Sequence, residues 1–292
     1  MVASSVSQAR VWFITGSSRG LGRVLAETLL ERGERVVLTA RNPQQVEDLA
    51  AKYPGCALAV QLDVTKPEQV REAVKQAIAN FGRIDVLVNN AGYSTVGTIE
   101  EVSDDAVRHL FEANFFGVLE MLRAVLPHMR QQRSGHILNI SSMLCFAASA
   151  TNGFYSSSKL ALEGISGALA NEVAPFGIKV TIVEPGAFRT DFITRSVVVT
   201  DTHIEDYKAS IGDIRQQLRN ADHDKLGDPK KASLAMIQVV DSDNPPMRLA
   251  LGADAVDLID GALEFIKAEL DAWKEVAVNT AFKEMRTYAK TL

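Results

Sequence analysis

Short apolar runs alternate with longer amphipathic stretches along most of the chain. Each short run is typical of a strand buried on both faces, whereas in the longer stretches apolar residues recur every three to four positions, as on a helix. The runs predict strands at 10–15, 35–40, 57–62, 84–88, 135–142, 179–184 and 247–251, and the clearest amphipathic stretches predict helices at 67–81, 103–130 and 255–276. We therefore predict the α/β class: a single domain over residues 1–292, with one doubly wound parallel sheet between two helical layers and a C-terminal helical extension at 253–292.

Composition narrows the functions that such a domain can have. The 292 residues are 47% hydrophobic, enough for a full core, and the net charge of −5 comes without a basic block, which argues against nucleic-acid binding. Cys56 and Cys145 fit neither a metal site nor a disulfide framework, and His203 and His223 are expected to be solvated rather than metal ligands. No leader-like segment or apolar run of about 18 residues is present. We expect a cytoplasmic protein with no membrane segment and no metal.

A glycine-rich turn separates the first predicted strand from the amphipathic stretch that follows it. Glycines let the backbone approach a pyrophosphate closely, and the start of a helix offers free N–H groups to the same anion. A strand, a glycine turn and a helix in this order open a Rossmann fold and predict nucleotide binding. The expected contacts come from Gly16, Ser18, Arg19, Gly20, Leu21 and Gly22.

The end of the second predicted strand indicates which nucleotide is bound. NAD-binding folds place an acidic residue there for the ribose 2′-hydroxyl, but this chain has Ala40 followed by Arg41. A guanidinium pairs with a 2′-phosphate that a carboxylate would repel. Arg41, with Arg19 as a second cation, therefore favours NADP(H) as the cofactor.

Two further strand ends carry candidate cofactor contacts. Asp63, followed by Val64, is placed to accept from the adenine amine or, equally, to cap the next helix. Asn90, Ala91 and Gly92 follow the fourth predicted strand, and small residues at that point fit the crevice in which open α/β sheets bind ligands.

The candidate chemistry is carried by Tyr155 and Lys159, with Ser142 thirteen residues before the tyrosine. Residues four apart share one face of a helix, so the phenol and the ammonium project side by side. A free phenol titrates near ~10, and a neighbouring cation favours its ionised form. Ser142, at the end of a predicted strand, is placed to bond the same reacting oxygen. The alternative is a surface helix pair, since this spacing is common by chance.

Six motifs together resemble those of the short-chain dehydrogenase/reductase family. They stand in the family's order and spacing: Thr15-Gly16-x-x-x-Gly20-x-Gly22, Asn89-Asn90-Ala91-Gly92, Asn114, Ser142, Tyr155-x-x-x-Lys159 and Pro185-Gly186-x-x-x-Thr190. The resemblance is strong over residues 10–190 and implies the branch with a single Rossmann domain.

The resemblance also implies a role for each matching residue. Tyr155 would be the general acid in reduction or the base in oxidation. Lys159 would bind the nicotinamide ribose and lower the pKa of the tyrosine, and Ser142 would hold the substrate oxygen. Asn114 would fix a water in a proton relay. The nicotinamide amide would be held by Pro185, Gly186, Phe188 and Thr190.

The substrate side is expected to be apolar, with residues 191–228 as the lid. The lining residues are Met143, Leu144, Cys145, Phe154, Phe188 and Phe192, which suit a hydrophobic ketone or alcohol. Family members often have glycine at the position of Cys145; we interpret this cysteine as an apolar lining residue rather than a thiol sensor. Trp273 is expected to anchor the C-terminal helix.

These features predict an NADP-dependent oxidoreductase that transfers hydride between nicotinamide and a hydrophobic carbonyl or alcohol. An epimerase or dehydratase of the extended branch is one alternative, although its glycine pattern differs from Gly16, Gly20 and Gly22. A non-catalytic NADP-sensing regulator is another, although such proteins typically lose the tyrosine or the lysine. We expect a homodimer joined through the long helices that contain Asn114 and Tyr155.

Overall fold

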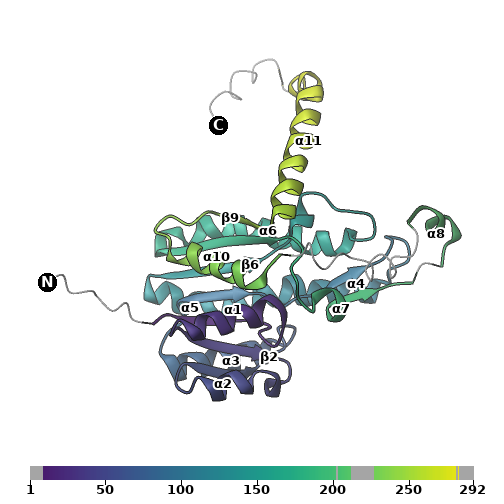
Figure 1. Ribbon diagram of the computed structural model, residues 1–292. Coiled ribbons are helices and arrows are strands. Elements are labelled where there is room, and N and C mark those ends of the chain that lie inside the picture. Colours follow the sequence, from purple (N-terminus) through teal and green to yellow (C-terminus); the bar gives the residue numbers. More distant parts are fainter. Residues whose placement is uncertain (1–8, 202, 212–226, 281, 283–292) are drawn as a thin grey trace.

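The central feature is a seven-stranded sheet in which every neighbouring pair of strands is parallel. A computed structural model describes residues 9–201, 203–211, 227–280 and 282 (Figure 1). The strands are β1 (Val11–Ile14), β2 (Arg35–Ala40), β3 (Ala57–Gln61), β4 (Val86–Asn89), β6 (Gly135–Ile140), β7 (Ile178–Pro185) and β9 (Arg248–Leu251). Their order is β3-β2-β1-β4-β6-β7-β9, which reverses direction between β1 and β4. The predicted doubly wound Rossmann sheet is confirmed, and the reversal opens a crevice at the carboxyl ends of the strands.

Helices cover both faces of the sheet because its strands are apolar on both sides. In β1, Trp12 and Ile14 point into one hydrophobic core, whereas Val11 and Phe13 point into the other. The first core is closed by α1 (Gly20–Glu31), α2 (Glu47–Lys52) and α10 (Pro229–Asp241). The second is closed by α3 (Pro67–Phe81), α5 (Gly117–Gln132) and α6 (Gly153–Val173). The predicted three layers are therefore present.

The helix predicted at 103–130 is interrupted in its middle. It consists of α4 (Asp104–Phe111), a π-helical turn (Glu112–Phe116) and then α5. A π turn inserts one residue into the helical repeat and is common at functional sites. Asn114 lies within this turn and is fully buried.

A second, two-stranded sheet holds the described part of the segment expected to be the lid. β5 (Ser94–Val96) pairs in parallel with β8 (Val197–Val199), and α7 (Phe192–Arg195) and α8 (Glu205–Ile211) flank the latter strand. The carboxylate of Glu101 accepts hydrogen bonds from the backbone N–H groups of His203 and Ile204 at 2.6 and 2.9 Å. Residues 202 and 212–226 of the predicted lid, which include His223, lie outside the described residues.

The C-terminal helix, α11 (Ala253–Val278), confirms the predicted helical extension up to its last described residues. It projects away from the body of the molecule in Figure 1, and its first turns contact β9 and the turn Met143–Cys145. The expectation that Trp273 anchors it is wrong, because this side chain is 67% exposed. Within the described ranges, no helix is both long and apolar enough to cross a membrane, and no cluster of three or more His, Cys, Asp or Glu is arranged to hold a metal ion.

Candidate active site

Tyr155, Lys159 and Ser142 meet at the carboxyl edge of the sheet. The parallel pairing of β4, β6 and β7 brings their carboxyl ends together, and Ser142 is the second residue after β6. Tyr155 and Lys159 stand on the first turns of α6, and all three side chains are buried. The ammonium of Lys159 donates to the carbonyl oxygen of Ile140 at 2.8 Å. The sequence motif is therefore a buried cluster rather than a surface pair.

Burial shifts the pKa of both ionisable groups in this cluster. It raises the pKa of Tyr155 to about 12, an effect that a hydrogen bond with the Ser142 side chain opposes. Burial also lowers the pKa of Lys159 to about 8. The sequence argument expected the cation to lower the pKa of the phenol, but desolvation is the larger effect in this structure. Tyr155 is consequently protonated at neutral pH, which is the state of a proton donor.

The amide of Asn114 joins the loop after β4 to α6. Its nitrogen donates to the Tyr93 carbonyl oxygen at 2.9 Å and to Ser158 Oγ at 3.0 Å, while its oxygen accepts from the Tyr93 N–H at 3.1 Å. Ser158 Oγ in turn donates to the carbonyl oxygen of Tyr155 at 2.7 Å. A Cβ on Gly92 would come within 2.9 Å of Asn114 Oδ1 and 3.4 Å of Lys159 Nζ. Asn114 therefore fixes the backbone on both sides of the cluster.

The glycine turn has the shape of a phosphate cradle. Gly16 and Gly20 adopt left-handed backbone angles, φ +69° and +60°. A Cβ on Gly22 would overlap the side-chain amide of Asn90, which donates to the carbonyl oxygens of Thr15 and Gly16 at 2.9 Å. The first turn of α1 has no side-chain cap, which leaves its N–H groups for an anion. These residues fit the pyrophosphate of a dinucleotide.

Sequence reasoning chose Ser18 in this turn but missed its neighbour, Ser17. Ser17 is fully buried and exchanges hydrogen bonds with Thr39 of β2: its N–H donates to the Thr39 carbonyl at 2.8 Å, and its Oγ accepts from the Thr39 N–H at 2.7 Å. Thr39 Oγ1 also accepts from the Gly16 N–H at 3.2 Å. The available signal was a threonine within the apolar part of β2, since a buried hydroxyl requires a partner.

The two arginines proposed for the cofactor lie in different environments. Arg41 is exposed immediately after β2, and its guanidinium makes no ion pair with any described residue. Arg19 instead donates to the carbonyl oxygen of Arg195 and to Ser196 Oγ, both at 3.1 Å. Arg19 therefore ties the glycine turn to the lid segment, and the case for a 2′-phosphate depends on Arg41.

The alternative in which Asp63 caps the next helix is wrong, because the N-cap of α3 is Lys66 and the helix has no side-chain cap hydrogen bond. The carboxylate of Asp63 instead accepts from the N–H and the hydroxyl of Thr65 at 3.0 and 2.8 Å, in the turn before α3. Val64 packs where a Cβ on Gly117 would overlap it. Both residues are thus engaged with the fold, and their contact with adenine stays a prediction.

The turn after β7 is held by the first turn of α11. Asp254 accepts from the Ala187 N–H at 2.7 Å, and a Cβ on Gly186, next to Pro185, would overlap the same carboxylate. Thr190 faces the glycine turn, with its Cβ 3.9 Å from the place that a Cβ on Gly20 would take. Sequence analysis did not find Asp254, because it lies more than sixty residues from the turn that it supports.

The proposed substrate residues divide into buried and half-exposed side chains. Cys145 is buried, and its Sγ lies 3.2 Å from Ser141 Oγ; burial raises the pKa of the thiol to about 12, which opposes thiolate chemistry. Phe188 is buried with its ring against Gly227, whereas Phe192 is 37% exposed. Met143, Leu144 and Phe154 are partly exposed around Tyr155 and Ser142.

A charged network that the sequence did not reveal lies behind Ser142. The guanidinium of Arg248 pairs with the buried carboxylates of Glu163 and Glu184. Ser141 Oγ donates to Glu163 at 2.7 Å, and Arg248 stacks over the Phe146 ring at 5.5 Å. Burial, together with the nearby carboxylate of Glu163, raises the pKa of Glu184 against the effect of the arginine. The network braces the backbone that carries Ser142.

Curated proteins with similar sequences are oxidoreductases. The short chain dehydrogenase family model matches residues 10–198. Oxidoreductase BOA17 of Botryotinia fuckeliana is 41% identical over 273 residues, which cover 93% of this chain and 99% of that protein. A 3-ketodihydrosphingosine reductase of Bacteroides thetaiotaomicron is 40% identical, over 84% of this chain and 88% of its own.

Solved structures that resemble this chain are also dehydrogenases or reductases. A short-chain dehydrogenase from Streptomyces avermitilis has a TM-score of 0.87 and 43% identity, with 94% of this chain and 99% of that chain covered. A Thermococcus sibiricus alcohol dehydrogenase complexed with 5-hydroxy-NADP has a TM-score of 0.69 and 25% identity (coverage 84% and 96%). A Brucella melitensis 3-ketoacyl-(acyl-carrier-protein) reductase complexed with NADH has a TM-score of 0.70 and 26% identity, with 84% of this chain and 97% of that chain covered. Together with the Tyr155 cluster and the phosphate cradle, these matches show that the chain belongs to the short-chain dehydrogenase/reductase family.

Proposed function

We propose that the protein is a cytoplasmic, NADP-dependent oxidoreductase that interconverts a hydrophobic ketone or aldehyde and its alcohol. The observation that carries this proposal is the buried cluster of Tyr155, Ser142 and Lys159 beside the glycine cradle. A bound nicotinamide would supply or accept the hydride. The protein's own residues would manage the proton and the orientation of the substrate.

In reduction, Tyr155 donates its proton to the oxygen of the substrate. Its raised pKa keeps the proton in place until the oxygen becomes basic, and the hydroxyl of Ser142 orients the same oxygen. The ammonium of Lys159 stabilises the phenolate that forms and binds the ribose. Asn114 holds Tyr93 and Ser158 in place and, by resemblance to the family, fixes a water for proton return. In oxidation, the same groups act in reverse.

NADP is proposed over NAD because of the end of β2. Ala40 provides no carboxylate for a 2′-hydroxyl, and the exposed Arg41 has no competing ion pair among the described residues. Similar structures carry either an NADP derivative or NADH, so the family alone does not decide the cofactor.

A hydrophobic carbonyl substrate is proposed from the residues around Tyr155. Met143, Leu144 and Phe154 supply apolar, partly exposed surface next to Ser142 or Tyr155 in the chain, and Phe192 on α7 is exposed. The Bacteroides relative is named for a ketone of a sphingoid base, which supports the same substrate class. Because Tyr155 and Lys159 are both present, catalysis is favoured over a purely regulatory NADP sensor.

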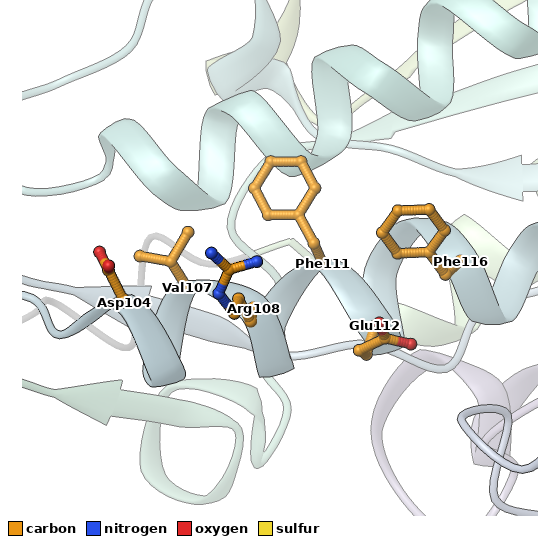
Figure 2. A pocket seen from close by; sticks show the side chains of 6 residues that line it. All are labelled: Asp104, Val107, Arg108, Phe111, Glu112 and Phe116. Atoms are coloured by element: carbon orange, nitrogen blue, oxygen red, sulfur yellow. The ribbon is translucent and has the colours of Figure 1, made fainter.

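We also propose a homodimer through the face formed by α4, the π turn and α6. Phe116 and Leu160 are 47% and 49% exposed on this face. A shallow groove runs along it, and Figure 2 shows Phe111 and Phe116 on one side of the helix with Glu112 on the other. The groove is lined by Asp104, Val107, Arg108, Phe111, Glu112 and Phe116. Half-exposed aromatic side chains of this kind are typical of the core of an interface.

Replacing Tyr155 with Phe should remove the proton donor and leave the packing unchanged. We expect kcat for reduction of a panel of hydrophobic ketones to fall by at least ~10²-fold, with NADPH binding nearly unchanged. NADPH oxidation followed by absorbance measures the first quantity, and fluorescence titration measures the second. Tyr53→Phe, remote from the cluster at the end of α2, is the control and should retain the parental rate. A Tyr155→Phe enzyme that turns over at the parental rate would refute the assignment, and a parent inactive on every ketone would favour the sensor.

The pH dependence of reduction should reflect Lys159. Its pKa is lowered to about 8, so the ammonium is charged below that pH and is lost as the pH rises through it. Tyr155, with a pKa of about 12, remains protonated over the same range. We therefore expect kcat/KM for reduction to be level near pH 6–7 and to fall above about pH 8. In Lys159→Arg, whose side chain stays charged, the fall should disappear. A decline of equal size in both enzymes would assign it to another group.

Arg41→Asp should reverse the cofactor preference. A charge-assisted hydrogen bond on an exposed group, reduced by solvent screening, corresponds to a preference for NADPH of about tenfold or somewhat more. The new carboxylate should repel the 2′-phosphate and accept from the 2′-hydroxyl of NADH. The measurement is kcat/KM for both cofactors, with Arg71→Asp on the surface of α3 as the charge-matched control. A parent that uses NADH as well as NADPH would contradict the cofactor proposal without affecting the role of Tyr155.

The proposed α4–α6 contact can be tested by mass. Phe116→Glu combined with Leu160→Glu should halve the molar mass measured by light scattering, because two carboxylates per chain would be buried without partners. Leu234→Glu, on an exposed position of α10 across the sheet, should leave the mass unchanged. An unaltered mass in the double variant would show that this face makes no contact in solution.

A further inference from the structure

Among the residues that the structure describes, no other element covers the outer part of the long helix α11. Among its residues Ala253–Val278, only Ala255 is buried. Figure 1 shows the helix projecting from the body, attached at its first turns. Large apolar side chains nevertheless continue along it, and Val256, Leu263, Ile266, Leu270 and Trp273 are 51–67% exposed. An exposed apolar surface of this extent marks an interaction site.

These side chains have the spacing of a coiled-coil seam. Starting at Val256, apolar residues occur at alternating intervals of three and four along the whole helix. The seam consists of Val256, Ile259, Leu263, Ile266, Leu270, Trp273 and Ala277. This 3.5-residue repeat keeps the stripe facing one partner helix as the two supercoil. Leu263 and Leu270 occupy a positions of the heptad, and Ile266 and Trp273 occupy d positions.

The charges beside the seam complement a second copy of the same helix. Glu269 lies at a g position and Lys274 at the e position five residues later, and neither forms a salt bridge with another described residue. In a parallel pair, the g position of one helix faces the e position of the next heptad on the other helix. Glu269 of each copy would therefore pair with Lys274 of the other copy, which gives two such pairs. Val256, one turn from the root, is 52% exposed, so the body does not cover the start of the seam.

A lipid surface fits the helix less well. Interfacial helices carry lysines and arginines on their polar face. In α11 the basic residues are Lys267 and Lys274, and carboxylates outnumber them. The acidic residues are Asp254, Asp257, Asp260, Glu264, Glu269, Asp271 and Glu275. Anionic head groups would repel this face.

We propose that α11 pairs in parallel with α11 of a second copy of this chain, as a two-stranded coiled coil. This contact is separate from the one proposed for α4 and α6. If both form, the assembly holds four chains, and disruption of either contact leaves two.

The test is the molar mass of Leu263→Glu combined with Leu270→Glu, measured by light scattering beside the parent. We expect the mass to halve while kcat/KM stays at the parental value, since both residues lie outside the catalytic cluster. Phe265→Glu is the matched control: this side chain is 63% exposed on the same helix but lies off the seam, and its variant should keep the parental mass. An unchanged mass in the double variant, or an equal loss in Phe265→Glu, would overturn the proposal.

The relative orientation of the two α11 helices is tested by a cysteine at heptad position a. Ala277→Cys should give a covalent dimer on mild oxidation, because equivalent a positions face each other only in a parallel pair. Failure to cross-link in a protein whose mass still depends on Leu263 and Leu270 would overturn the parallel arrangement. Flotation with zwitterionic and anionic vesicles completes the test. Binding that is lost in Leu263→Glu with Leu270→Glu, without a change of mass, would identify a lipid surface as the occupant instead.

Discussion

The buried amide of Asn114 is the constraint on which the rest of the site depends. It makes three hydrogen bonds, to both backbone groups of Tyr93 and to Ser158, and so connects the loop after β4 to the helix that carries Tyr155. Leaving such a group unpaired in the interior costs about 1–3 kcal/mol, so the amide specifies the relative position of the two elements. The π turn that interrupts α4 and α5 is the local distortion that carries this side chain. A regular helix would shift the residues that follow Asn114 by one position relative to their partners.

Desolvation gives the cluster its chemistry. The same burial that keeps the proton on Tyr155 makes Lys159 a weaker base, so the pKa values of the two groups move apart. A buried phenol can only lose its proton when a charge is stabilised next to it, and Lys159 on the adjacent helical turn is the group that provides this. Behind them, the pairing of Arg248 with Glu163 and Glu184 keeps two buried carboxylates compensated and fixes the strand ends. The buried cluster is therefore backed by a charged network.

Sequence reasoning succeeded where one local pattern determines the structure. Continuous apolar runs identified all seven strands of the main sheet, because a strand covered by helices on both faces has apolar side chains on both faces. The spacing of Tyr155 and Lys159 was enough to place them together, since i and i+4 share a helical face. The glycine turn could also be predicted, because its glycines lie within one short segment of the sequence.

Features that depend on contacts between distant parts of the chain could not be predicted from the sequence. β5 and β8 have only three residues each and exist because they pair with one another across the site. Arg19 was assigned to the cofactor by its position in the glycine turn, and the contact of its guanidinium with the lid segment was not predicted. Asp254 and Arg248 bond to residues more than sixty positions away in the chain, so no short segment of sequence contains both partners. Trp273 was expected to anchor the C-terminal helix, yet its side chain is exposed.

The root of α11 links this seam to the site. Asp254, in the first turn of the helix, accepts the hydrogen bond of Ala187 and fills the space beside Gly186. Gly252, at φ +103°, provides the sharp turn that lets the helix leave β9 in this direction, and a residue with a Cβ would be strained there and would overlap Asp254. The direction of the helix is thus set by the same contacts that shape the turn expected to hold the nicotinamide. A helix fixed in this way at its base is pre-organised for a partner, because less conformational freedom is lost when the two copies associate.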